Sequence, residues 1–187
     1  MDGLVVDLDI RESAGKLEVK STRSPERVPE DASATLERRM RRMLQLNVDI
    51  ADFMELASAS PEHAWVRSKS FGRLLCGTTL FEDIVKIIAT TNTMWSQTVR
   101  MVELLVEKCG RRSSLGFTAF PEPGEIARFS PEDLKRDCRL GYRATAVHRL
   151  AAGVATGEID LDRVSDPSQS TEGLFAAYRT LPGIGPY

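Results

Sequence analysis

The spacing of the apolar residues changes partway along this chain, and this change constrains the fold more than any other feature. From Leu4 to Ile10 they occupy alternate positions, the period of a strand with one buried face. Leu17 and Val19 continue the alternation after a Ser13-Ala14-Gly15 turn, which predicts a β-hairpin over residues 3–22. Two strands alone are marginally stable in water. We therefore expect residues 1–23 to be the remnant of an N-terminal sheet domain, followed by a polar linker over residues 24–34.

From residue 35 to residue 187 the period is helical, so the fold class is mainly α, a helical bundle preceded by the hairpin. Gly110 is expected to end one helix and Ser130-Pro131 to begin another, as N-cap and first helical residue. Two apolar faces are predicted: Leu80, Ile84, Ile87 and Ile88 over residues 80–89, and Trp95, Val99, Val102 and Val106 over the next helix. Helices are also predicted around residues 36–44, 50–57, 61–65, 143–155 and 171–180.

Composition narrows the class of protein without identifying it. The 187 residues carry a net charge of −2, which gives no overall nucleic-acid signature, and they include no apolar stretch of membrane-spanning length. The three cysteines lack metal-ligand spacing and are expected to be reduced thiols that fill the core. We expect no membrane association and no metal site, and a monomer in the cytoplasm (nucleoid-associated in a bacterium) or in the nucleus.

The most informative segment is Leu181-Pro182-Gly183-Ile184-Gly185, which follows the last predicted helix. Proline stops that helix, and two glycines around one apolar residue permit a tight hairpin with positive φ. Such a hairpin exposes successive backbone N–H groups, which together can hold an anion such as a DNA phosphate. An ordinary turn would have the same sequence, so the segment gains weight only from what precedes it.

The preceding segments resemble the helix-hairpin-helix DNA glycosylase superfamily, in the branch of the 8-oxoguanine and 3-methyladenine enzymes. The resemblance covers residues 36–187, and the order of the matching segments makes it specific. They are MLQLNVDIADFMELA (43–57), FGRLLCGTTLFEDIVKIIATTN (71–92), FPEPGEIARFSPEDLKRDCRLGYRATAV (120–147) and LPGIG (181–185). The resemblance implies base-excision repair of double-stranded DNA that contains a damaged base, and a chain truncated at both ends.

The resemblance also implies roles for single residues. Asn92 would fill the gap left when the damaged nucleotide is flipped out, Tyr142 would wedge into the base stack, and Arg143 would lie near the opposite strand. Residues 181–185 would grip the backbone, with a monovalent cation as a candidate ligand. Each residue also has a plain structural alternative: a helix N-cap for Asn92, a loop anchor for Tyr142 and a solvated cation for Arg143.

Two further positions bear on chemistry. Gln97 stands where the 8-oxoguanine enzymes carry an arginine that reads the opposite cytosine, which weakens the case for strict specificity toward that pair. Tyr187 occupies the Schiff-base lysine position of bifunctional members, and a tyrosine has no amine for an imine. The resemblance therefore implies a monofunctional enzyme that uses water. Local charge is weaker evidence: Asp133 to Arg149 contains five basic and two acidic residues, a pattern that a solvated helix face would share.

The family's catalytic aspartate would lie about 20 residues past the Leu181–Gly185 hairpin, at ordinary helix and loop lengths, and so beyond Tyr187. We therefore assign no catalytic residue within the chain, expect no base excision from these 187 residues alone, and make no judgement on an iron–sulfur cluster. The leading hypothesis is a monofunctional DNA N-glycosylase that hydrolyses the glycosidic bond of a flipped purine. The alternatives are a non-catalytic helix-hairpin-helix DNA-binding module and a helical interaction domain unrelated to DNA.

Overall fold

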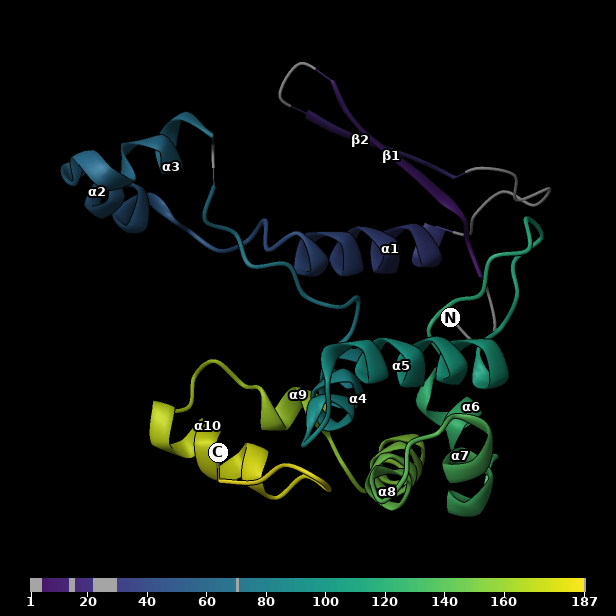
Figure 1. Ribbon diagram of the computed structural model, residues 1–187. Coiled ribbons are helices and arrows are strands. Elements are labelled where there is room, and N and C mark those ends of the chain that lie inside the picture. The colour runs from purple at the N-terminus through teal and green to yellow at the C-terminus, as the bar shows by residue number, and fades with distance from the viewer. Residues whose placement is uncertain (1–4, 14–15, 22–29, 70, 187) are drawn as a thin grey trace. The chain divides into compact units, whose positions relative to one another are not determined.

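The structure is a computed structural model that describes residues 5–13, 16–21, 30–69 and 71–186. Its described residues form helices and one antiparallel hairpin, which confirms the mainly α fold class (Figure 1). The chain divides into two compact units. The smaller unit is Val28–Asp83, and the larger unit comprises Met1–Arg27 and Ile84–Tyr187.

The predicted hairpin is present as β1 (Leu8–Ser13) and β2 (Lys16–Ser21), but its first strand begins later than expected, since residues 5–7 are not in a strand. The strands are antiparallel, with Ile10 opposite Val19 and Ser13 opposite Lys16. Ile10 and Val19 both remain exposed, so the described strands leave an apolar pair uncovered.

The smaller unit begins with α1 (Glu30–Met43), followed by α2 (Ala51–Ala59), a 3₁₀ turn (Pro61–His63) and α3 (Ala64–Ser68). The linker predicted over residues 24–34 is wrong from residue 30 onward, because residues 30–34 are already helical. Just before α2, the Asp49 carboxylate accepts from the Ala51 N–H at 2.9 Å.

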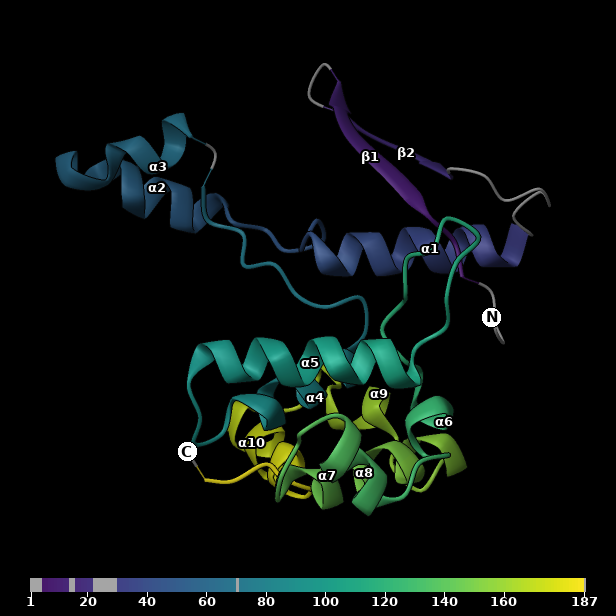
Figure 2. The ribbon, with the colours of Figure 1, turned by 45° about the vertical axis from the view of Figure 1, so that its right-hand side comes forward.

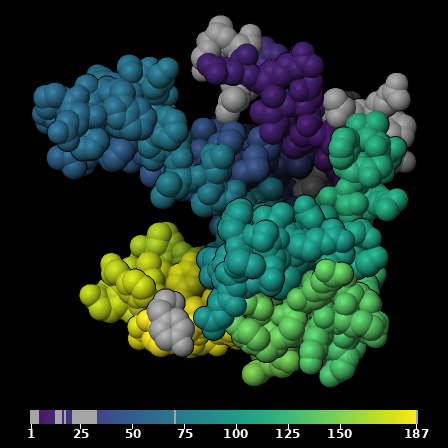
Figure 3. Space-filling view, viewed as in Figure 1, coloured from purple at the N-terminus to yellow at the C-terminus, as the bar shows by residue number. Residues whose placement is uncertain are grey.

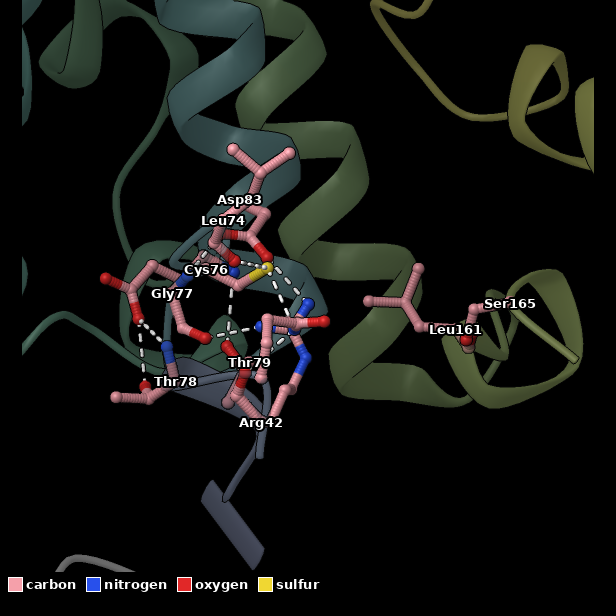
Figure 4. A network of polar contacts seen from close by, with 11 residues as sticks. Arg42, Leu74, Cys76, Gly77, Thr78, Thr79, Asp83, Leu161 and Ser165 are labelled. Carbon is pink, nitrogen blue, oxygen red and sulfur yellow. Dashed lines mark hydrogen bonds and ion pairs between the residues drawn. The ribbon is translucent and has the colours of Figure 1, made fainter. Parts of the chain in front are cut away.

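A polar network fixes the start of α4 (Leu80–Thr90), the helix that leads to the predicted gap-filling residue (Figure 4). The Asp83 carboxylate accepts from the Gly77 N–H (2.6 Å) and pairs with Arg42 (2.6 Å), whose guanidinium also donates to the Gly77 carbonyl. The Glu82 carboxylate accepts from both the N–H and the hydroxyl of Thr78, each at 2.9 Å. These acids satisfy backbone donors at the helix start that would otherwise lack partners.

In the larger unit, α8 (Arg143–Thr156) packs against α6 (Pro123–Ile126) and α7 (Pro131–Asp137), as Figures 1 and 2 show. Val147, Leu150 and Ala151 of α8 are fully buried. The predicted start of α7 is confirmed, because the Ser130 hydroxyl accepts from the Asp133 N–H at 3.1 Å. The remaining helices are α5 (Trp95–Cys109), α9 (Leu161–Val164) and α10 (Thr171–Arg179), and Figure 3 shows the teal, green and yellow segments of this unit side by side.

The predicted apolar faces of α4 and α5 need correction. Ile84 and Ile88 of α4 are buried as expected, but Ile87 is exposed. In α5 the buried face is Thr98, Met101, Leu104, Leu105 and Cys109, and the predicted face from Trp95 to Val106 lies beside it. Valine and tryptophan give a strong apolar stripe in the sequence, but the stripe that fits the unit's core is the one with the leucines.

The cysteines are free thiols, and Cys109 and Cys138 are buried in the larger unit as predicted, whereas Cys76 is partly exposed. Among the described ranges, none of the helices combines the length and apolar character that crossing a bilayer requires.

Candidate functional site

The turn that follows α4 holds Asn92 in the left-handed region, with φ of 45°. Asparagine tolerates this conformation better than most residues because its short polar side chain can hydrogen-bond to the nearby backbone. The Thr91 hydroxyl donates to the Ile88 carbonyl at 2.8 Å, which closes the end of the helix. The Asn92 side chain is exposed.

The loop before α8 meets this turn through Tyr142 and Arg143. The hydroxyls of Tyr142 and Thr91 are 3.2 Å apart, while the tyrosine side chain as a whole is 64% exposed. Arg143 is only 7% exposed; its Nε donates to the Thr91 hydroxyl at 3.1 Å and an Nη donates to the Thr91 carbonyl. Its guanidinium carbon also lies 4.6 Å from the centre of the Tyr142 ring. The buried Arg143 guanidinium therefore packs against the Tyr142 ring, most of which stays open to solvent.

The electrostatics of the tyrosine reflect the same neighbours. The hydrogen bond to Thr91 is the main cause that lowers the pKa of Tyr142; desolvation opposes it, and the Asn92 side chain and the Arg143 charge add smaller lowering effects. Asn92 and Tyr142, which are 50 positions apart in sequence, are thus neighbours in the structure.

Leu181 to Ile184 form a type II β-turn. The Ile184 N–H donates to the Leu181 carbonyl at 3.2 Å, proline occupies the second position, and Gly183 has φ of 82°. Space as well as conformation requires glycine: a Cβ at Gly183 would lie 2.8 Å from the Ala146 Cβ and 3.2 Å from Ile88 Cγ1. The hairpin is therefore pressed against α4 and α8. Leu181 is buried and anchors the start of the turn, while Gly185 is exposed.

These contacts bring three segments together. Ile88 is in α4, four residues before Asn92, and Ala146 is in α8, four residues after Tyr142. In Figures 1 and 2 the yellow C-terminal segment accordingly runs beside the end of α4. All eight residues predicted to bind DNA (Asn92, Tyr142, Arg143, Leu181, Pro182, Gly183, Ile184 and Gly185) therefore gather at one end of the larger unit.

The charge around this end is distributed unevenly. Of the five basic residues between Asp133 and Arg149, Arg136 pairs with Asp133 (2.7 Å) and Asp137 (2.8 Å), and Arg143 points inward. Lys135, Arg139 and Arg149 remain exposed. The first turns of α5 and α8 carry no acidic side chain, although those of α6, α7, α9 and α10 each do. The helix ends nearest Asn92 and Tyr142 thus keep their positive dipole ends uncompensated.

Two other features affect what the site can bind. The Thr93 hydroxyl lies 3.2 Å from Gln97 Oε1, so the exposed Gln97 amide is tied to the same turn as Asn92. Within the described part of the chain, no three histidine, cysteine or acidic side chains are grouped as metal ligands.

Comparison with solved structures finds similar folds that match nearly the whole length of this chain. A 3-methyladenine DNA-glycosylase from Archaeoglobus fulgidus matches 99% of this chain with a TM-score of 0.77 and 19% identity. MBOgg1 in complex with a low affinity DNA ligand matches 96% with a TM-score of 0.71 and 21% identity. This chain has the DNA glycosylase fold. An 8-oxoguanine glycosylase/lyase from Clostridium acetobutylicum, in complex with double-stranded DNA, matches 96% with a TM-score of 0.69 and 17% identity.

The chain spans about 60% of the length of these glycosylases: 62%, 59% and 59% in the order given. No protein-family model matches the sequence, and no curated protein matches it. The likeness to the glycosylases is therefore a likeness of fold, and the sequence identities are too low to transfer the roles of individual residues.

Sequence reasoning missed the residue at the centre of this arrangement. Thr91 bonds to Tyr142 and Arg143 and closes α4, yet a threonine at a helix end gives no functional signal in sequence. The short helices α6 and α9 and the bridge between Arg112 and Thr118 were also not predicted. Tyr187, expected at the Schiff-base position, lies outside the described residues.

Proposed function

We propose that this chain is the DNA-binding part of a base-excision DNA N-glycosylase. The observation that carries the proposal is the convergence of Asn92, Tyr142 and the Gly183 hairpin on Thr91, Ile88 and Ala146. An exposed amide, an exposed aromatic ring and a glycine hairpin have little reason to meet at one end of a folding unit unless they act on one ligand. The fold shared with the glycosylases supports duplex DNA as that ligand.

Each component has a distinct physical task in this proposal. The hairpin offers backbone N–H groups to a phosphate, and the acid-free first turns of α5 and α8 avoid repelling the DNA backbone. Tyr142 inserts its exposed ring into the base stack, and the Asn92 amide hydrogen-bonds to the base left without a partner. Together these contacts recover the few kcal/mol that extruding a nucleotide costs. Arg143 acts as a positioning residue that holds Tyr142 in place.

The reaction we propose is hydrolysis of the glycosidic bond of a flipped, oxidised or alkylated purine. Water is the nucleophile, since Tyr187 has no amine with which to form an imine. An aspartate in sequence beyond residue 187 would orient the water and stabilise the positive charge that develops on the sugar. Under this proposal the 187 residues bind damaged DNA but release no base.

We extend the proposal to the domains of the protein, a bound cation, the oligomeric state and the cellular compartment. Residues 1–23 would belong to an N-terminal sheet domain, a linker from residue 24 would join it to the helical part, which begins with α1 at Glu30, and that helical part would be incomplete. Backbone carbonyl oxygens are neutral ligands of the kind that monovalent cations bind, so those of the Leu181–Gly185 hairpin would hold such an ion. The protein would act as a monomer on chromosomal DNA, in a bacterial cytoplasm or a nucleus.

Fluorescence anisotropy with labelled duplexes tests the proposal. We expect salt-dependent binding, tighter for a duplex with a tetrahydrofuran abasic-site analogue than for an intact duplex. Tyr142→Ala should weaken binding to the abasic duplex by about tenfold, the scale of one lost stacking contact, and to intact duplex by much less. Phe117→Ala is the matched control, since Phe117 is 69% exposed and lies beyond the far end of α5.

Equal losses on both duplexes would reduce Tyr142 to a loop anchor. Binding without any preference for the abasic site would favour the non-catalytic module, and absence of salt-dependent binding would favour a helical interaction domain unrelated to DNA. For catalysis, the longer reading frame is assayed for excision on a panel of purine lesions. A frame that encodes no aspartate in the region after residue 187 would contradict the proposed hydrolysis.

A further inference from the structure

The most exposed large side chains of the larger unit include two adjacent ones at the start of α5. Trp95 is 74% exposed and Met94 is 67% exposed. They begin the apolar stripe that the core does not use, and exposure falls along it: Val99 is 39% exposed, while Val102 and Val106 are only partly exposed. The uncovered part of this stripe is thus concentrated at the end of α5 that follows Asn92. Leaving an indole in water forgoes the burial that makes tryptophan valuable in a core.

This position relates Trp95 directly to the proposed site. Trp95 follows Asn92 by three residues, and Thr91, on the other side of Asn92, is bonded to the Tyr142 hydroxyl. Two exposed aromatic rings therefore flank the turn that carries the exposed amide. Tyr142 reaches it from α8, and Trp95 reaches it along the chain itself.

We infer that Trp95 is a second aromatic contact to DNA, which stacks on the base pair beside the vacated position in the duplex. The inference rests on the proposed function and adds a residue to it that the sequence-based site did not include. Base–aromatic stacking needs only an exposed ring face, so it tolerates any base. The partner of this surface is a duplex with an open position, because an intact stack offers the indole no free base-pair face.

The side chains around Trp95 are compatible with a nucleic acid as the partner. The first turn of α5 has no acidic side chain, and the next side chains, Ser96 and Gln97, are exposed and uncharged. A phosphate backbone can therefore approach Trp95 without meeting a carboxylate in this turn. The aliphatic part of Met94 extends the apolar surface next to the ring.

The intrinsic fluorescence of Trp95 gives the test. The chain has two tryptophans, and the other, Trp65, lies in the smaller unit, where its ring centre is 5.6 Å from that of Phe71. Trp65→Phe keeps an aromatic contact with Phe71 and leaves Trp95 as the sole reporter. In this variant, titration with the abasic duplex should quench Trp95 emission over the concentration range in which anisotropy reports binding. Intact duplex should quench it less.

Affinity measurements complete the test. Trp95→Ala should weaken binding to the abasic duplex by about tenfold, and Trp95→Phe should retain most of the affinity, since a smaller ring still stacks. Phe117→Ala should leave both affinities unchanged. The helix α5 has 15 residues and spans about 22 Å at 1.5 Å per residue, and Phe117 lies in the loop that follows its far end.

The outcomes separate this inference from the proposed function. Normal binding with unchanged Trp95 emission, or a Trp95→Ala variant with unaltered affinity, would overturn the role of Trp95 and leave the proposed function standing. Blue-shifted emission in the free protein that DNA does not alter would show that another part of the protein covers the ring, which also overturns it. Absence of DNA binding in the parent protein would overturn both.

Discussion

Gly183→Ala is the substitution for which the structure predicts the sharpest effect. Two costs add. An alanine at φ of 82° pays about 1–2 kcal/mol for the left-handed conformation. Its Cβ would also lie 2.8 Å from the Ala146 Cβ and 3.2–3.3 Å from two Ile88 carbons, an overpacking that costs about 1–3 kcal/mol. The expected loss in the free energy of unfolding is therefore about 2–5 kcal/mol.

A matched control isolates the second cost. Gly157, which ends α8, has φ of 79°, but a Cβ there would meet nothing within 4 Å. Gly157→Ala should therefore cost only the conformational part, about 1–2 kcal/mol. Ala146→Gly in the Gly183→Ala background should recover about 1 kcal/mol of coupling, after allowance for glycine's poor helix propensity measured in the single Ala146→Gly variant.

Urea unfolding followed by far-UV circular dichroism compares the four variants, with amide hydrogen exchange to locate the change. Because the chain has two compact units, two transitions are resolved separately if both appear. If Gly183→Ala costs no more than Gly157→Ala, the hairpin does not press on α4 and α8, and the reasoning about the convergent site fails. Under the proposed function, Gly183→Ala should also weaken duplex binding.

Two further predictions concern groups that the structure buries. Arg143→Lys should cost about 1–3 kcal/mol of unfolding free energy in the same assay, because one ammonium cannot span the hydroxyl and carbonyl of Thr91. The control, Arg149→Lys, changes an exposed arginine and should cost less than about 0.5 kcal/mol. Equal losses in the two variants would contradict the positioning role of Arg143. In a thiol-reagent time course read by mass spectrometry, the partly exposed Cys76 should react first. Cys109 and Cys138, which are 7% and 1% exposed, should react only on unfolding. Simultaneous reaction of all three cysteines in the native protein would show that the larger unit is looser than described.

Much of the fold could be predicted because it depends on local signals. Ser130-Pro131 places the start of α7 through one side chain and one fixed φ, and both act within a single turn. The apolar faces of α5 were harder, since its sequence carries two stripes and only neighbouring helices decide which is buried. The start of α1 was missed by about five residues because a proline in a polar stretch looks like a linker while its acidic successors favour a helix.

The sequence by itself determined the elements of the candidate site. Pro182 and Gly183 require a turn whatever surrounds them, and an asparagine after α4 can adopt positive φ without help. Tertiary structure decided what those elements do together. Thr91, Arg143, Ile88 and Ala146 carry no distinctive local signal, yet they bring the turn, the tyrosine and the hairpin into contact across gaps of 37 to 95 positions. Backbone conformation depends on nearest neighbours, whereas close packing between helices is a property of residues that only folding brings together.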